Sequence, residues 1–309
     1  MWFKNLQPYR VAASWAMTAD ELAEALAKNA FTPPSCNEFE RCGWDKVRPD
    51  GGLVHVVNKQ MLIVLTIEKK VLPAAAINKV VKERAAEMEE SQGFAPGKKA
   101  LKELKERVTD ELLPRALSTR TSIRVWIDPC DGWLVVDAAA PAKADLVVKH
   151  LLKVIDRMPL ESWRVQRSPV AMMTMWLQEG HPCDHVPYMF TIDRDAVMRA
   201  TGEGRAQIAY KNHTLDPDDL KRHIATGKQC TSLAMTWGSK ISFVLTEALA
   251  IKRVKALDVL NEKDAPARNA DERFDADFML MTGELAKMLG DVTEALGGVP
   301  GVDEFFKKD

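Results

Sequence analysis

The stretch RFDADFMLMTGEL, residues 273–285, sets the architecture that the rest of the chain must fit. Its apolar residues recur at steps of three and four, and this spacing predicts an α-helix with one buried stripe. The stripe continues to Leu296, where Gly297-Gly298 predicts the end of the helix. Asp275 and Asp277 are expected in its first turn, where the helix macrodipole favours acids. A helix of this length and pattern is suited to cover one face of a sheet.

The segments before this helix alternate between strand and helix patterns. Residues 229–237, 240–246 and 249–257 predict an antiparallel meander, and residues 205–211 are strand-like. Between them, Asp216 is a predicted N-cap followed by Pro217 at the first helical position, and Gly227 ends that helix. A short helix rich in methionine is expected at residues 170–178.

The first half of the chain predicts two hairpins, at residues 53–67 and 123–136, each with a turn signal between its strands. Residues 18–21 form a capping box that begins a helix through Lys28, and another helix is expected at 142–158. Strands separated by helices, with few long crossovers, favour an α+β fold of antiparallel sheets with packed helices.

Two consecutive amphipathic helices between Pro73 and Leu113 predict a projecting helical hairpin. The first opens at Pro73, and residues 93–97 break it. Each helix carries a narrow apolar stripe and a charged remainder, so the pair can bury little besides itself. An arm of about 17 residues reaches roughly 25 Å. In a homo-oligomer the simplest partner for such an arm is its own copy.

A chain of 309 residues is long enough for two or three lobes. We expect residues 1–72 and 114–165 to form a central α+β body, residues 73–113 to form the arm at its tip, and residues 166–309 to form a C-terminal α+β lobe at its base.

Composition and cysteine usage indicate a cytoplasmic protein. No apolar run approaches the length of a membrane span, and the N-terminus lacks the pattern of a signal peptide. The five cysteines are scattered and odd in number, which favours reduced thiols over a disulfide framework.

The net charge of −1 hides an uneven distribution. Residues 258–309 contain thirteen acidic and six basic residues, a balance of −7, so residues 1–257 carry +6. A basic body with an acidic C-terminal segment can bind phosphates locally despite a near-neutral total.

Motifs of catalysis are absent from the sequence, and we expect no enzyme and no cofactor. There is no dinucleotide-binding or phosphate-binding glycine loop and no nucleophile elbow. His181, Cys183 and His185 lie within five residues and suggest a metal site, but no second group of ligands completes it. A metal-dependent nuclease or phosphatase using this loop is one alternative function, and a protein-interaction scaffold is another.

The stretch at 273–285 closely resembles the C-terminal signature of the recombination-associated RdgC family of bacteria. Further matches follow in the same order along the chain: MWFKNL at 1–6, AFTP at 30–33, LLPRA at 112–116, WID at 126–128, and His223-Ile224 with Gly227-Lys228. The resemblance implies a ring-forming homodimer with a central hole wide enough for duplex DNA. It also implies nonspecific binding to double-stranded DNA, association with the nucleoid, and restraint of RecA-type recombination without catalysis.

Candidate site residues come partly from this resemblance and partly from position. Lys211-Asn212-His213 aligns with a family segment implicated in DNA binding, with His213 standing where relatives often have glutamine. Arg115, Arg120 and Lys211 are expected where elements end, so that their side chains can point into a cavity. The resemblance adds Lys228 to the DNA-binding set. Leu117, where relatives carry an aromatic residue, joins the arm residues Phe94, Leu101 and Leu104 as a predicted dimer contact.

Overall fold

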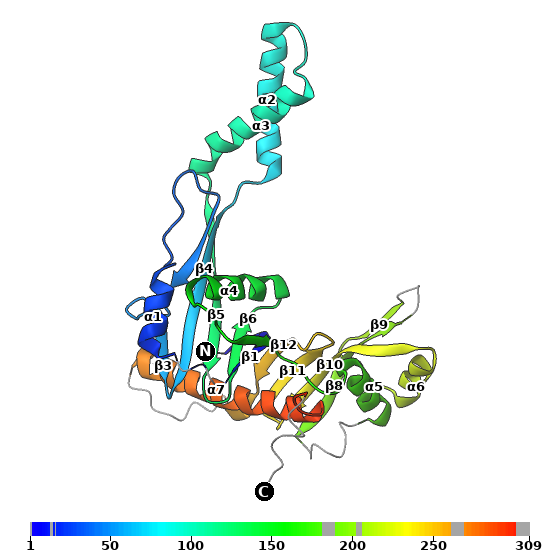
Figure 1. The fold of residues 1–309 in the computed structure, drawn as a ribbon. Helices are drawn as coiled ribbons and strands as arrows, with labels where there is room; N and C mark the ends of the chain where they lie inside the picture. The colour runs from blue at the N-terminus through cyan, green and yellow to red at the C-terminus, as the bar shows by residue number, and fades with distance from the viewer. Residues whose placement is uncertain are drawn as a thin grey trace.

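A computed structural model describes residues 2–12, 15, 17–180, 189–201, 206–260 and 269–300 (Figure 1). It is built on one twelve-stranded sheet in the order β2-β4-β5-β6-β1-β12-β11-β10-β8-β9, with β3 paired to β4 and β7 paired to β1. Each pair of named strands is antiparallel. The α+β class is confirmed, with one large sheet in place of the several that were predicted.

Seven α-helices within the described residues accompany the sheet. The strands are β1 Leu6–Val11, β2 Glu40–Asp45, β3 Val54–Val57, β4 Gln60–Lys70, β5 Ser118–Asp128, β6 Trp133–Asp137, β7 Leu160–Ser162, β8 Phe190–Ala200, β9 Gln207–Tyr210, β10 Lys228–Trp237, β11 Ile241–Thr246 and β12 Ile251–Ala256. The helices are α1 Ala19–Ala27, α2 Ala74–Gln92, α3 Lys98–Leu112, α4 Pro141–Val154, α5 Pro169–Glu179, α6 Pro217–Ala225 and α7 Ala270–Ala295, with short 3-10 turns at Leu113–Arg115 and Asp258–Leu260.

Helix α7 carries the predicted buried stripe. Phe278, Met281 and Leu285 are fully buried, and Leu296 follows the last turn. The helix begins earlier than expected, because Asn269 caps it through a hydrogen bond from the Glu272 N–H. Its first turn therefore holds Asp271 and Glu272, and the placement of Asp275 and Asp277 in that turn was wrong.

The hairpins and the meander form as predicted, whereas strands β2, β7 and β8 were not predicted. The capping box at Thr18 is present, and Asn58 and Lys59 take positive φ in the tight turn between β3 and β4. Strands β2, β7 and β8 carry charged residues or are too short to give a strand pattern. Helix α4 also ends at Val154, four residues before the predicted end, and β7 follows it.

The two faces of the sheet are covered differently. On one face, α7 and α5 pack against residues from both ends of the sheet, among them Trp126, Leu233 and Phe243. On the other face, α1 and α4 cover the half made by β2, β4, β5, β6 and β1. That second face continues onto β12, β11, β10 and β8, and there no helix of the described part of the chain packs against it. We call this uncovered region the open face.

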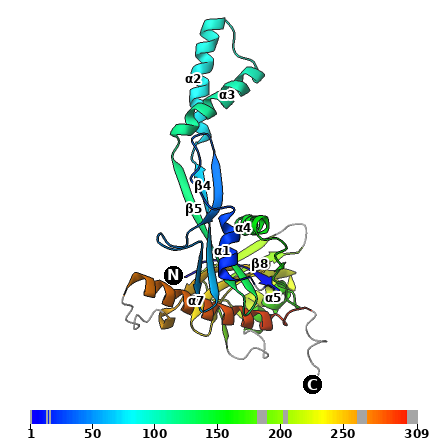
Figure 2. The same cartoon turned by 60° about the vertical axis from the view of Figure 1, so that its left-hand side comes forward.

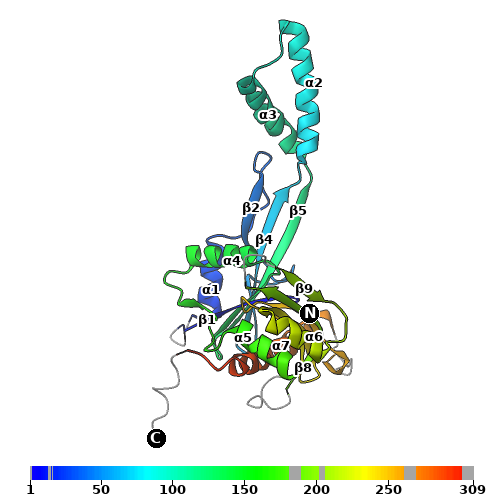
Figure 3. The same ribbon diagram turned by 90° about the vertical axis from the view of Figure 1, so that its right-hand side faces the viewer.

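The predicted arm is present and extends from the end of β4 and the start of β5 (Figure 2). Helices α2 and α3 share a small core of Ile77, Leu104 and Val108. In all three views the arm lies at one end of the molecule and α7 at the opposite end, beneath the sheet (Figures 1–3). The open face, on the other side of the sheet from α7, is therefore turned toward the arm. The dimer and the predicted domain boundaries stay predictions.

Two neighbouring residues of α7 test whether this helix holds the sheet together. Phe278 is fully buried in the main core, and Met279 is 47% exposed. We expect Phe278→Ala to lower the free energy of unfolding by about 3–5 kcal/mol because it removes a large buried ring and leaves a cavity. Met279→Ala should change it by less than about 0.5 kcal/mol. Urea denaturation of the two variants measures the difference, and equal losses would contradict the assignment.

Candidate nucleic-acid interface

The floor of the open face is built from small side chains. Along β10 and β11, residues alternate between the helix-covered face and the open face. Leu233, Met235 and Phe243 enter the core, while Ser232, Ala234, Ser242 and Val244 line the open face. Two adjoining hollows of about 500 and 390 Å³ result. A floor of this kind lets another molecule approach the sheet closely.

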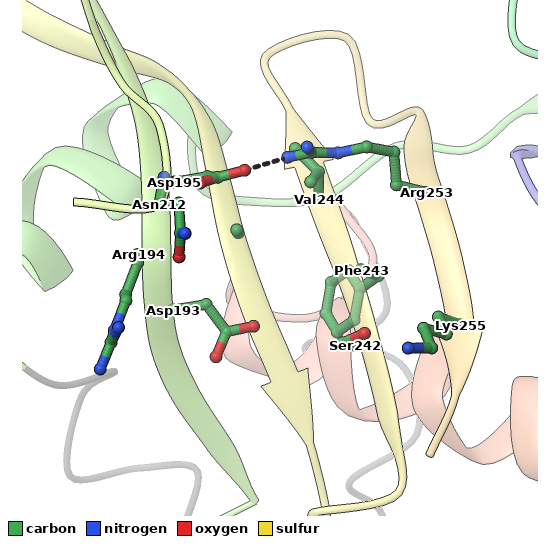
Figure 4. Close-up of a pocket in the computed structure, with 10 residues that line it drawn as sticks. Asp193, Arg194, Asp195, Asn212, Ser242, Phe243, Val244, Arg253 and Lys255 are labelled. Carbon is green, nitrogen blue, oxygen red and sulfur yellow. Dashed lines mark hydrogen bonds and ion pairs between the residues drawn. The ribbon is translucent and has the colours of Figure 1, made fainter.

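Cations outnumber carboxylates around this floor. The residues lining the two hollows include five cations and two carboxylates, a balance of +3. The carboxylates are Asp193 and Asp195, both on β8. The cations are Lys211, Lys252, Arg253 and Lys255, together with Arg194, whose side chain points away from the floor (Figure 4).

An ion pair crosses the middle of the open face (Figure 4). Arg253 on β12 donates from Nη2 to Oδ2 of Asp195 on β8 over 2.7 Å, above Val244. Both residues line both hollows. The pair therefore lies as a crossbar between the hollows, and we keep that name for it.

Asp195 also fixes the loop that follows β9. Its Oδ1 accepts the backbone N–H of Asn212 at 2.6 Å. Asn212 has φ of +48°, a left-handed conformation that asparagine tolerates better than most residues. The hydrogen bond from the Asn212 N–H lowers the pKa of Asp195 most, followed by the hydrogen bond and charge of Arg253 and the charge of Lys211, so this carboxyl is ionised at neutral pH.

The predicted segment Lys211-Asn212-His213 lies at the rim of the open face. Lys211 directly follows the end of β9, as expected, and is exposed. Lys211 and Asn212 line the hollows. The exposed imidazole of His213 instead lies 2.7 Å from the Thr214 carbonyl through Nδ1, and its ring is 6.2 Å from that of Tyr210.

Arg115 and Arg120 lie away from this rim, at the root of the arm. Arg115 is exposed in the 3-10 turn after α3. The expectation that Arg120 follows the end of an element is wrong, because β5 already begins at Ser118. Arg120 pairs with Asp45, which also accepts from Thr66 Oγ1 at 2.9 Å. Burial alone would raise the pKa of Asp45, and these hydrogen bonds together lower it.

Lys228 is separated from Lys211 along the sheet. Lys228 pairs with Ala200, and Tyr210, the residue before Lys211, pairs with Ala196. These two partners are four residues apart on β8, a distance of about 13 Å. The Nζ of Lys228 donates to Thr226 Oγ1 at 2.9 Å, beside the end of α6. The predicted DNA-binding residues thus occupy three places in the subunit rather than one.

The four predicted dimer contacts differ in exposure. Leu117 is 82% exposed and Phe94 is 66% exposed, the first at the root of the arm and the second in the loop between α2 and α3. Leu101, on α3, is 36% exposed. Leu104 is buried against Ile77 and Val108 inside the arm itself.

The described part of the chain shows no metal site and no membrane-spanning helix, and its cysteines are reduced. The residues that the structure describes include no group of three histidine, cysteine or acidic side chains able to hold a metal ion. The suspected loop at 181–185 lies outside the described residues. Cys36, Cys42, Cys130 and Cys230 are free thiols. No helix among the described residues is both long and apolar enough to cross a membrane.

Residue patterns did not identify the residues of β8 and β12 on the open face. Strand β8 was missed, and with it the two aspartates; Arg253 and Lys255 were placed in a strand but given no role. Which face a strand leaves open depends on where helices pack, and strand periodicity alone does not contain that information.

Comparison with known proteins finds matches along nearly the whole chain. A family model described as "Putative exonuclease, RdgC" matches residues 1–299. Proteins named "Recombination-associated protein RdgC" from Janthinobacterium sp. (strain Marseille) and Herminiimonas arsenicoxydans are each 57% identical over 299 residues, covering 96% of this chain and 98% of the relative. The protein of that name from Burkholderia cenocepacia is 56% identical, covering 96% of each chain. The chain therefore belongs to the RdgC family of recombination-associated proteins.

Proposed function

We propose that this protein binds double-stranded DNA through the open face, without sequence specificity, as a dimer that encloses the duplex. The observation that carries the proposal is the open face itself: half of one sheet face is left uncovered, and cations surround its floor of small residues. Lysine and arginine contacts to phosphates give affinity that does not depend on base sequence.

The charges of the subunit are separated across the sheet in a way that favours this orientation. Helix α7 contains seven acidic and two basic residues, a balance of −5, and it covers the face opposite the open one. Arg48 and Lys240 pair with three of these acids and offset part of that charge, and the remaining acids disfavour a polyanion on the α7 side relative to the open face. This separation accounts for how a chain of net charge −1 could still bind DNA.

Sequence-independent binding follows from the shape of the open face. The residues that line the hollows come from strands and from the loop after β9, and no helix among the described residues projects from this face to enter a major groove. Short side chains such as Ser232, Ala234 and Ser242 cannot reach far into a groove. Long cations at the rim can reach the phosphates.

A second copy of the chain is the partner that suits the arm. Residues 73–113 contain eight basic and eight acidic residues, so the arm as a whole does not attract a polyanion. A surface that carries both signs can be complementary to itself, as a two-fold interface requires. Phe94 and Leu101 at the arm, with Leu117 at its root, supply exposed apolar contacts. Contact between two arms, each extending beyond the open face of its subunit, would close a ring, as the family resemblance implies.

Duplex DNA covered in this way is less accessible to other DNA-binding proteins. Relatives are named for an association with recombination. We therefore infer that the chain restrains RecA-type strand exchange by occupying the duplex, in association with the nucleoid and without a catalytic step. Arg115 and Arg120 at the root of the arm, and Lys228 on β10, stay proposed as further DNA contacts.

An exonuclease is the rival function, since the family description includes that word. Metal-dependent hydrolysis of DNA needs carboxylate or imidazole ligands brought together. The described residues lack such a group. Asp193 and Asp195 on the open face already accept hydrogen bonds from Thr236 and from Asn212 and Arg253.

Salt dependence tests the phosphate contacts. With six to ten contacts, affinity for a random duplex should fall by about 10³–10⁵ between 50 and 200 mM salt. Lys211→Glu should weaken binding to all sequences alike and lower the slope of log affinity against log salt by about 1. Lys287→Glu, on the exposed side of α7, is the matched control and should match the wild type. A flat salt response, or a loss confined to one sequence, would contradict the proposal.

Incubation with labelled duplex and Mg²⁺ or Mn²⁺ separates binding from hydrolysis. We expect the DNA to be retarded in a gel and then recovered at full length after the protein is removed, because the residues that the structure describes hold no group of side chains able to bind a catalytic metal ion. Shortened DNA that a chelator prevents would instead establish a nuclease, and metal analysis of the purified protein would then show whether the 181–185 loop holds the ion.

The arm is tested by removing its exposed apolar residues. The double variant Phe94→Ser, Leu101→Ser should raise the dimer dissociation constant about tenfold or more, measured by analytical ultracentrifugation, since buried aromatic anchors dominate such interfaces. Leu152→Ser removes a leucine of α4 whose exposure, 52%, lies between those of Leu101 and Phe94, and it should leave the dimer unchanged. The wild type should also load more readily on linear than on closed circular duplex. Equal loading, or a dimer that the double variant leaves unchanged, would contradict the ring.

A further inference from the structure

Strand β12 places an additional cation on the open face through a β-bulge. Ser242 pairs with Lys255 and Val244 pairs with Lys252, so Arg253 and Val254 together oppose the single residue Phe243. Arg253 is the extra residue, and its φ of +52° lies in the left-handed region, which costs free energy for a residue with a side chain.

The consequence of the bulge is a row of three cations on one strand. Strict alternation would send every second residue of β12 into the core. With the bulge, Val254 still enters the core, while Lys252, Arg253 and Lys255 all line the hollows of the open face. Bulges and backbone strain of this kind occur preferentially where a side chain must be re-aimed for function. Nothing in the packing of the core requires the extra residue to be arginine.

The middle cation of the row is neutralised in the free protein. The side chains of Arg253 and Asp195 together span β11 and β10, and that of Arg253 is 63% exposed, against 28% for that of Asp195 (Figure 4). Exposed ion pairs are held weakly, and salt or a competing anion can replace one partner. The crossbar also lies over the floor that a bound duplex backbone would approach, because both hollows share its two residues.

We infer that Arg253 becomes a phosphate contact when duplex DNA binds. In the free protein Asp195 pairs with Arg253 across the open face, and in the complex a DNA phosphate replaces Asp195 as the partner of Arg253. This inference rests on the proposed function. Lys252 and Lys255 flank Arg253 and form the rest of the phosphate-binding row. In the bound state Asp195 keeps its hydrogen bond from Asn212 and so continues to position the Lys211-Asn212 loop. Asp195 is thus a positioning residue and also lowers the affinity of the free face for DNA.

If a DNA phosphate replaces Asp195 as the partner of Arg253, substitutions at these two residues should change the affinity for DNA in opposite directions. Arg253→Gln should weaken DNA binding several-fold and lower the salt slope by about 0.9 for each phosphate that the protein no longer neutralises. Asp195→Asn keeps an oxygen for the Asn212 N–H but releases Arg253, so it should tighten binding several-fold and steepen the salt slope. A residue that only maintained the fold would weaken binding when changed.

A matched aspartate separates the release of Arg253 from a simple loss of negative charge. Asp193 lies on the same strand, lines the same hollow and accepts from Thr236 Oγ1 at 2.9 Å, but it forms no ion pair with a cation of the described residues. Asp193→Asn therefore removes the same negative charge but releases no cation. In the wild-type background, Asp195→Asn should increase the affinity for duplex DNA by more than Asp193→Asn does. In the Arg253→Gln background, the two substitutions should increase that affinity equally.

The experiment is a salt titration of binding to a random duplex, by fluorescence anisotropy, for the full-length wild type and these variants. The predicted result is tighter binding for Asp195→Asn, weaker binding for Arg253→Gln, and loss of the Asp195→Asn advantage in the double variant. Wild-type affinity in Asp195→Asn and Arg253→Gln, with Lys211→Glu still impaired, would overturn the crossbar alone. Wild-type protein that does not bind duplex at all would overturn both the crossbar and the proposed function.

Discussion

The unequal covering of one sheet is the constraint on which the rest of the structure depends. Helix α7 and α5 bury one face across both halves of the sheet, and α1 with α4 bury half of the other. A sheet face left in water must be polar or small-featured, and here it is both. The open face is therefore a direct consequence of how the helices are distributed, and the placement of charge follows from it.

Charge is arranged on opposite sides of the sheet rather than along the chain. The acids of α7 lie beyond the covered face, and the cations of β12 and of the loop after β9 lie around the open one. Two of the acids of α7 also make contacts within the fold: Glu284 pairs with Lys240 at 3.1 Å, and Asp291 accepts from the indole of Trp237 at 2.6 Å. The near-neutral total therefore conceals an unequal placement of charge on the two sides of the sheet, with a balance of +3 among the residues that line the hollows.

Local patterns predicted the elements well where local physics determines them. The capping box at Thr18, the Pro217 helix start and the long stripe of α7 depend on neighbours within one or two turns, and each is present. Strand β8 was missed because its alternation includes Asp193, Arg194 and Asp195 on a half-exposed strand. Its place in the sheet is fixed by pairing with β10, some thirty residues later in the chain.

The candidate site was predicted only at its rim. Family resemblance led to Lys211 and Asn212, and both lie beside the hollows. Arg253 could not have been identified from periodicity, because a bulge breaks the alternation that periodicity assumes, and its partner Asp195 is distant in sequence. The position of Arg120 within β5, paired with Asp45, likewise depends on a strand pairing that residue order does not reveal.

Lysine acylation with and without duplex DNA tests most directly whether the open face is where DNA lies. Bound DNA should protect Lys211, Lys252 and Lys255 from the reagent, while Lys287 on the outer side of α7 reacts at the same rate in both samples. Protection of Lys287, or unchanged reactivity of the three open-face lysines when DNA is bound, would contradict this position of the DNA.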